Sequence, residues 1–305
     1  MAKYRLLRER VMTEGIIDSA DLREAMPASW ADLALVHTPE YLTNVEHGTL
    51  PREIQRRIGF PWSPQMVERA RRSVGATIQA SRAALEDGTA ANLAGGTHHA
   101  FAGCGEGFCV FNDVAVAARV LLRDGAIARA AVVDCDVHQG NGTAAIFAGD
   151  DRVFTFSMHG ANNFPFRKET SDLDVMLDDG LGDDDYLALL ERHLPSVLDR
   201  ARPDVVFYVS GADPYHGDRL GRLTLTIEGL RQRDALVFAG CRARGVPVVV
   251  TMAGGYAMNV EAIVTIHANT IREAARSVGP PSLRSRGMEL RRAGHRAGPG
   301  PHVFA

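Results

Sequence analysis

The sequence lacks several features that mark whole classes of protein. No apolar run approaches the roughly 20 residues that a membrane-spanning helix needs, and the charged N-terminus has no apolar segment typical of a signal peptide. The four cysteines have no CxxC spacing, which argues against a zinc ribbon and a disulfide scaffold. A net charge of -3 argues against a general nucleic-acid binder or a polybasic membrane protein. We therefore predict a cytoplasmic protein with free thiols, of undetermined oligomeric state.

The composition that remains is that of an ordinary globular protein, with 305 residues, 46% of them hydrophobic and 23% charged. Four β-type apolar runs predict buried strands at Ala130–Val137, Val153–Met158, Asp204–Ser210 and Pro247–Met252. Helical spacing and end signals predict helices between Ser63 and Gly88, between Asn112 and Gly125, and over Asp183–Arg200, Glu228–Arg244 and Val260–Arg276. Alternating strands and helices predict an α/β fold with a mostly parallel central sheet and helices on both faces.

The end of the chain differs in composition from the rest. Residues 279–305 are rich in glycine, proline and arginine and contain few apolar residues. We therefore predict a disordered tail after a single domain of residues 1–278. The tail lacks the interleaved aromatic residues and dense charge block of a nucleic-acid-binding arm, which favours a solvated segment.

Polar side chains follow two of the predicted strands. Asp134, Asp136 and His138 alternate along the end of the first strand and so share one face, and Asp213 follows the third strand. Ligands of open parallel sheets bind beyond the carboxyl ends of the strands. Two carboxylates and an imidazole crowded on one face require a cation, and these ligand types suit zinc, with Fe²⁺ or Co²⁺ as alternatives.

Other residues at the same edge complete a possible hydrolytic site. His98 and His99 follow a short apolar segment, and Tyr256 follows Gly254 and Gly255 after the fourth strand. The glycines let the backbone pass close to a ligand. Each feature alone has a structural interpretation as a cap, a surface histidine pair or a turn. Their joint order favours a metal-assisted amide hydrolase in which a histidine moves the proton and the tyrosine hydroxyl stabilises the oxyanion.

Four segments of the chain resemble the histone deacetylase family in sequence and in order. The similarity runs from about residue 20 to residue 275, and the HQGNG form resembles class IV deacetylases and their bacterial relatives, which include acetyl-lysine and acetylpolyamine deacetylases. The segments are GGTHHAFAGCGEGFCVFNDVAVAAR, VVDCDVHQGNGTAAIF, VSGADPYHGDRLG and MAGGYA.

This resemblance implies an arginase/deacetylase-type α/β fold and zinc-dependent removal of acyl groups from amines, typically lysine side chains. By position, the zinc ligands are Asp136, His138 and Asp213. The tandem histidines are His98 and His99, of which His99 is the main general base. Tyr256 matches the transition-state tyrosine, and Gly254 belongs to the same substrate-binding turn.

The resemblance also assigns supporting residues. Asp134 matches the carboxylate that orients the first histidine, and with Ser157 nearby it helps to bind a structural monovalent cation such as K⁺. Gly107 and Phe108 match the wall of the acyl-lysine channel. The implied substrates are acylated lysine in a peptide or protein, or an acylpolyamine, with acetyl or longer acyl chains.

The chain departs from the family pattern at two places. Many members carry aspartate where this chain has Asn141, the expected partner of His99, and a neutral amide stabilises an imidazolium less than a carboxylate does. Members also have a strand and loop before the segment matching KYRLLRERV, so an edge strand and part of the site rim are expected to be missing or to start elsewhere.

Two other functions fit parts of the pattern. A binuclear manganese hydrolase of the arginase type would need a second set of ligands, of which only His98 is evident. A non-catalytic acyl-lysine-binding protein would be expected to have lost a zinc ligand or the tyrosine, and neither is lost. The residues therefore favour an active zinc deacylase.

Overall fold

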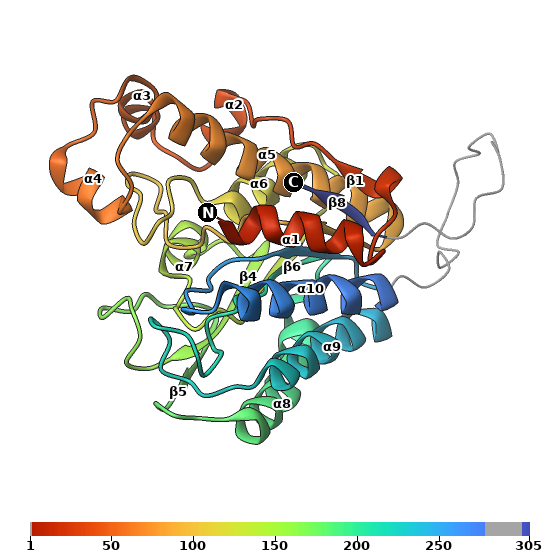
Figure 1. Cartoon of the computed structure of the whole chain (residues 1–305). Coiled ribbons are helices and arrows are strands. Elements are labelled where there is room, and N and C mark those ends of the chain that lie inside the picture. The colour runs from red at the N-terminus through yellow and green to blue at the C-terminus, as the bar shows by residue number, and fades with distance from the viewer. Residues whose placement is uncertain (1, 278–300) are drawn as a thin grey trace, which may run out of the picture.

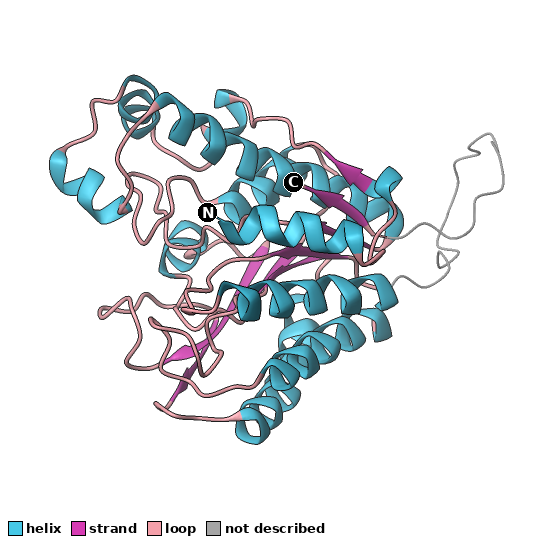
Figure 2. Cartoon of the chain, in the orientation of Figure 1, coloured by secondary structure: helices cyan, strands magenta, loops and turns pink. Residues whose placement is uncertain are grey.

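The computed structural model describes residues 2–277 and 301–305, and its centre is one eight-stranded parallel sheet (Figures 1 and 2). The strand order across the sheet is β1-β8-β2-β7-β6-β3-β4-β5. The strands are β1 (Leu22–Arg23), β2 (Thr89–Asn92), β3 (Ala130–Asp134), β4 (Val153–Gly160), β5 (Leu173–Leu177), β6 (Val205–Val209), β7 (Val248–Thr251) and β8 (His302–Phe304). All four predicted strands are present, but the first ends at Asp134 instead of Val137, so Asp136 and His138 lie in the turn beyond it and not along the strand.

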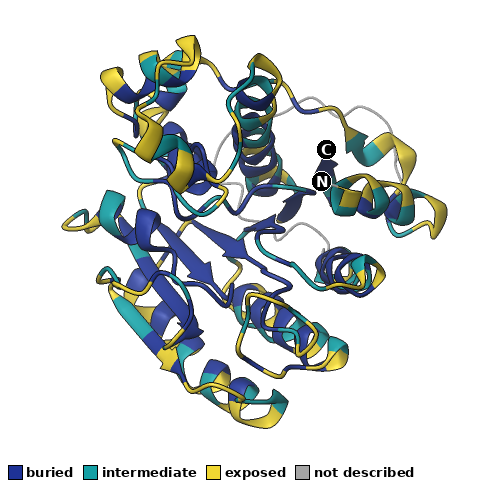
Figure 3. Ribbon diagram, turned by 60° about the vertical axis from the view of Figure 1, so that its left-hand side comes forward, coloured by how far each residue is buried: buried dark blue, intermediate teal, exposed yellow. Residues whose placement is uncertain are grey.

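Helices cover both faces of the sheet, as the alternation predicts. One face packs against α1 (Ala2–Thr13), α8 (Asp183–Ala201), α9 (Ile227–Ala243) and α10 (Val260–Ser277). The other packs against α2 (Trp30–Leu33), α3 (Pro39–His47), α4 (Arg52–Ile58), α5 (Pro64–Asp87), α6 (Asp113–Arg123) and α7 (Asn141–Phe147). The central strands are buried, and the exposed residues lie on the outer sides of the helices (Figure 3).

The apolar runs form strands because both of their faces have a partner. In β3, Ala131 and Val133 belong to the core on the α8–α10 side, whereas Ala130 and Val132 belong to the core on the α5–α6 side. All five residues of β3 and of β6 are buried. This two-sided burial explains why the strands are continuous apolar runs in the sequence instead of alternating patterns.

The helix-end signals act as predicted. The Ser63 side chain accepts a hydrogen bond from the Met66 amide at 3.1 Å, and Gly88 ends α5 with a left-handed φ of 88°. Asn112 caps α6 through the Ala115 amide at 3.0 Å. These caps fix where α5 ends before β2 and where α6 begins after the histidine loop.

The prediction of a disordered tail is wrong for the last residues of the chain. His302–Phe304 form β8, which lies between β1 and β2 and is parallel to both. Val303 and Phe304 are buried. The prediction missed this strand because it rested on the glycine, proline and arginine content of the whole segment, and only the last few residues are apolar. Residues 278–300 lie outside the described part of the chain, so the domain boundary at residue 278 stays a prediction.

None of the helices in the described part of the chain is long and apolar enough to cross a membrane. The longest, α5, has 24 residues but carries charged side chains along its length.

A buried arginine connects helix α9 to the loops that follow two of the strands. Arg233 of α9 is fully buried and donates to the carbonyls of Gly211 at 2.7 Å and Cys135 at 3.2 Å. It also pairs with Asp234 at 2.8 Å, and Asp234 accepts from the Tyr208 hydroxyl at 2.5 Å. The arginine therefore holds together the two loops that follow β3 and β6.

We expect Arg233→Met to lower the free energy of unfolding by about 3–5 kcal/mol, because it leaves Asp234 buried without its counter-charge. Urea unfolding of the purified protein measures this change. Arg242→Met on the exposed side of the same helix is the control and should change stability by less than about 0.5 kcal/mol. Equal effects of the two substitutions on the free energy of unfolding would contradict this structural role of Arg233.

Candidate metal centre and active site

The turn after β3 places two carboxylates and an imidazole in succession. The Asp134 carboxylate accepts a hydrogen bond from the Asp136 amide at 3.1 Å, and Asp136 accepts one from the His138 amide at 2.9 Å. These side-chain-to-backbone bonds fold the chain tightly at the strand end, as aspartate does in turns. The turn directs Asp136 and His138 toward the neighbouring strand.

That neighbour is β6, and Asp213 lies in the loop beyond it. Asp213 accepts a hydrogen bond from the Val137 amide at 3.0 Å. The Nδ1 atom of His138 lies 3.0 Å from an Asp136 oxygen and 3.2 Å from Oδ2 of Asp213. One ligand atom from each of the three side chains lies within 4.8 Å of the others, and all three residues are buried.

The surroundings of this trio fit a divalent cation. The Oδ2 atom of Asp213 is buried and receives no hydrogen bond within the described residues. Burial and the neighbouring Asp136 carboxylate raise the pKa of Asp213 to about 6. The raised pKa indicates that the nearby positive charge does not balance two ionised carboxylates. A Cβ atom on Gly254 would lie 1.7 Å from that oxygen, so only glycine permits this approach. Carboxylate and imidazole ligands suit zinc.

The tandem histidines lie beside the trio because a buried carboxylate holds their loop. Asp113, the first residue of α6, accepts hydrogen bonds from the Gly96 amide at 3.1 Å and the Thr97 amide at 2.7 Å. The Thr77 hydroxyl of α5 donates to the same carboxylate at 2.6 Å. Asp113 is fully buried and was not among the predicted site residues, because an aspartate in the first turn of a helix gives no sign of this long-range role.

His98 is held in its charged form. Its Nδ1 lies 2.6 Å from Asp134, and its Nε2 lies 3.8 Å from Asp136. Burial opposes the charge, but the two carboxylates outweigh burial and raise the pKa of His98 to about 9.

His99 has the opposite environment. Its Nδ1 lies 2.7 Å from Oδ1 of Asn141, a neutral partner. Burial and the charges of His98 and His138 hold the pKa of His99 well below its usual value. The rings of His98 and His99 lie 4.2 Å apart, so one site contains a charged and a neutral histidine.

Aromatic rings lie beside His99 and Tyr256. Gly107 has a left-handed φ of 55°, and a Cβ there would lie 2.5 Å from the His99 ring. The Phe108 ring lies 5.8 Å from the Tyr256 ring. Phe164 lies 5.0 Å from His99. Phe164 was not predicted, since its only signal is a position in the loop after β4.

Tyr256 is held by its backbone and by the first helix. Its amide donates to Asp218 at 2.5 Å. Lys3 donates to the carbonyls of Ala253 at 2.9 Å and Gly255 at 3.4 Å, and its Nζ lies 5.5 Å from the tyrosine ring. Burial raises the pKa of Tyr256 well above its usual value, so the phenol stays a hydrogen-bond donor at neutral pH. Lys3 was not predicted, because it is more than 250 residues away in the sequence.

The residues predicted for a monovalent cation are neighbours in the sheet. Asp134 of β3 is paired with Ser157 of β4 in the strand register. The Ser157 hydroxyl lies 2.9 Å from the Nδ1 atom of His159. A role for this pair in cation binding stays a prediction.

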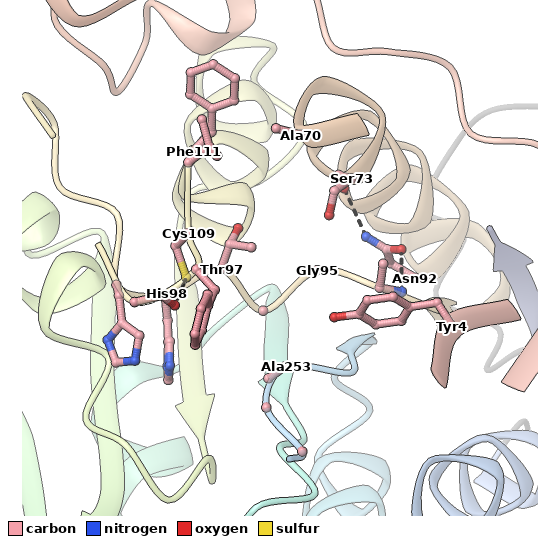
Figure 4. Close-up of a pocket in the computed structure, with 18 of the residues that line it drawn as sticks. Tyr4, Ala70, Ser73, Asn92, Gly95, Thr97, His98, Cys109, Phe111 and Ala253 are labelled. Atoms are coloured by element: carbon pink, nitrogen blue, oxygen red, sulfur yellow. Dashed lines mark hydrogen bonds between the residues drawn. The ribbon is translucent and has the colours of Figure 1, made fainter. Parts of the chain in front are cut away.

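The trio, the histidines and Tyr256 line one cavity of about 760 Å³. Its far end lies beyond Gly95 and Ala253, where Figure 4 shows Tyr4, Ser73 and Asn92 on the opposite side from His98. Ala70, Ala76 and Ala305 also line the cavity, together with larger side chains such as Arg69 and Arg72. The cavity is therefore much larger than an acetyl group.

A model of the histone deacetylase domain matches residues 1–271. The chain belongs to the histone deacetylase family. It is 48% identical to an uncharacterized protein of Picosynechococcus over 91% of this chain and 92% of the relative. It is 33% identical to a histone deacetylase-like amidohydrolase of Pseudomonas aeruginosa over 83% of this chain and 70% of the relative. Among solved structures, an HDAC homolog complexed with SAHA has a TM-score of 0.75 and 25% identity, covering 90% of this chain and 81% of that one.

Membership of the histone deacetylase family confirms the predicted family, fold and general class of hydrolase. Within the described residues, only Asp136, His138 and Asp213 form a group of three histidine, cysteine, aspartate or glutamate side chains whose ligand atoms lie within 4.8 Å of one another.

We expect zinc binding to release protons at pH 7. Burial would lower the pKa of His138, but Asp136 and Asp213 raise it to about 10, so the metal-free imidazole carries a proton that the ion must displace. Zinc affinity should fall about tenfold per unit of decreasing pH near neutrality, and more steeply below pH 6, where Asp213 also takes up a proton.

Calorimetric titration of the metal-free protein in two buffers of different ionisation enthalpy measures the released protons. Asp213→Asn is the control and should lose tight zinc binding together with the proton release. A binding enthalpy that is the same in both buffers would contradict the assignment of His138.

Proposed function

We propose that the protein is a zinc-dependent deacylase that removes acetyl or longer acyl groups from lysine side chains or related amines. The observation that supports it most is the buried trio of Asp136, His138 and Asp213 beside a charged histidine, a neutral histidine and a tyrosine in one cavity. Asp136, His138 and Asp213 would hold the zinc ion, which would supply Lewis-acid polarisation of the acyl carbonyl and the attacking water.

The residues of the chain divide the proton transfers between them. His99 donates a hydrogen bond from Nδ1–H to Oδ1 of Asn141, which leaves the lone pair of Nε2 free to take a proton from water. His98, oriented and kept charged by Asp134, stabilises negative charge as the carbonyl is attacked. The Tyr256 hydroxyl donates to the oxyanion, and the amine leaves with a proton returned from a histidine. The pairing of Asp134 with Ser157 supports the further proposal of a structural K⁺ nearby.

The cavity supports acyl chains longer than acetyl as substrates. Phe108 and Phe164 offer apolar walls for a lysine side chain. The part of the cavity past Gly95 and Ala253, on the side of Tyr4, Ser73 and Asn92, then offers room for the acyl chain. A panel of acetyl-, butyryl- and myristoyl-lysine peptides with acetylpolyamines tests this proposal. Zinc-loaded protein that leaves every member intact would contradict a deacylase function.

We expect Tyr256→Phe to lower kcat by about 100-fold or more while zinc content stays the same, because only the oxyanion donor is removed. Steady-state turnover together with metal analysis checks both parts. An unchanged rate would rule out the role of the hydroxyl.

We expect Ala76→Leu to lower turnover of a myristoyl-lysine peptide at least about tenfold, because Ala76 lines the cavity one helical turn after Ser73 on α5 and a larger side chain takes up space there. Acetyl-lysine turnover is the internal control and should change by less than about twofold. Equal loss for both substrates would indicate a damaged fold, and no loss for either would place the acyl chain elsewhere.

A further inference from the structure

The partner of His99 is an amide with two different ends. The Asn141 side chain is buried, its Oδ1 lies 2.7 Å from the His99 ring, and its Nδ2 donates to the Glu106 carboxylate at 3.4 Å. The three side chains thus form a line that runs from the base outward to a carboxylate. Glu106 lies in the loop that precedes the channel residues Gly107 and Phe108.

The direction of the Asn141 amide matters for the base. With Oδ1 toward the ring, His99 must carry its proton on Nδ1, and Nε2 has a free lone pair. With the amide turned by half a revolution, Nδ2 would donate to Nδ1, and the neutral ring would carry its proton on Nε2. That second tautomer cannot accept a proton from water at Nε2. An aspartate partner can only accept a hydrogen bond and would exclude that tautomer. Asparagine can donate or accept, so it does not exclude the tautomer.

A carboxylate next to the other end of the amide removes this ambiguity. Ionised Glu106 has only acceptors, so it binds the NH₂ end of Asn141 and leaves the oxygen for His99. We propose that Glu106 is a positioning residue that sets the tautomer of His99 through Asn141. The inference rests on the proposed function, because it assigns His99 the role of base.

Glu106 is itself held in place. Arg57, near the end of α4, donates to its carboxylate at 3.0 Å. The Glu106 amide donates to the Cys109 carbonyl at 3.0 Å, and the Arg57 carbonyl accepts from the Gly107 amide at 3.0 Å. The carboxylate is half-buried, with 17% of its side chain exposed. It is therefore paired with Arg57, held in orientation and within hydrogen-bond distance of the amide.

Glu106→Gln tests the proposal with little change in shape. A glutamine both donates and accepts, so it accommodates either orientation of Asn141. We expect kcat for an acyl-lysine peptide to fall at least about tenfold, with KM within about twofold and zinc content unchanged. Glu53→Gln removes an exposed carboxylate from α4 and is the matched control, with kcat unchanged.

A second substitution should reverse the defect. In Glu106→Gln, the further change Asn141→Asp supplies a partner that can only accept, so the double variant should regain most of the lost kcat. Asn141→Asp alone places two carboxylates side by side and should be less active than the double variant. A merely structural role of Glu106 does not produce this rescue.

The tautomer can be read without turnover. In zinc-loaded protein with ¹⁵N-labelled histidine, the His99 ring should show its proton on Nδ1, and Glu106→Gln should populate the Nε2–H form. An unchanged tautomer in that variant, or a double variant no more active than Glu106→Gln, would overturn the inference and leave the deacylase proposal intact. Wild-type protein without deacylase activity but with a Glu106-dependent tautomer would instead contradict the proposed function alone.

Discussion

The need to balance buried negative charge governs this structure. Asp136 and Asp213 follow two adjacent parallel strands, so their carboxylates converge on His138 at one sheet edge, away from water. Burying two carboxylates is unfavourable unless positive charge compensates for them. Protonated histidine provides part of that charge in the metal-free protein, and a divalent ion fits the remainder. The same constraint explains the residue at position 254, where only glycine leaves room for the Asp213 carboxylate.

The histidine pair shows how one site keeps two identical side chains in different states. His98 faces a carboxylate and is charged, whereas His99 faces an amide and is neutral. Separated pKa values of this kind allow one group to stabilise charge while the other accepts a proton. The low pKa of His99 comes from burial and from the charges of His98 and His138, and its neutral partner Asn141 does not supply the carboxylate that keeps His98 charged.

Much of the fold and of the site could be predicted because the signals are local. The apolar run of β3 and the alternating residues after it predict a buried strand that ends in a metal site, and the structure brings those residues together. Long-range features could not be predicted. Glu106, Lys3 and Phe164 reach the site through loop and helix packing, and β8 is a three-residue strand whose sheet position no short segment reveals.

The central claim concerns the location of one metal ion, and crystals of the zinc-loaded protein test it directly. Anomalous diffraction measured on both sides of the zinc absorption edge should give a single strong peak in each molecule. We predict that this peak lies about 2.0–2.2 Å from Nδ1 of His138 and from one oxygen each of Asp136 and Asp213. A peak elsewhere, a second peak of equal height beside the first, or no peak in an active preparation would contradict the account.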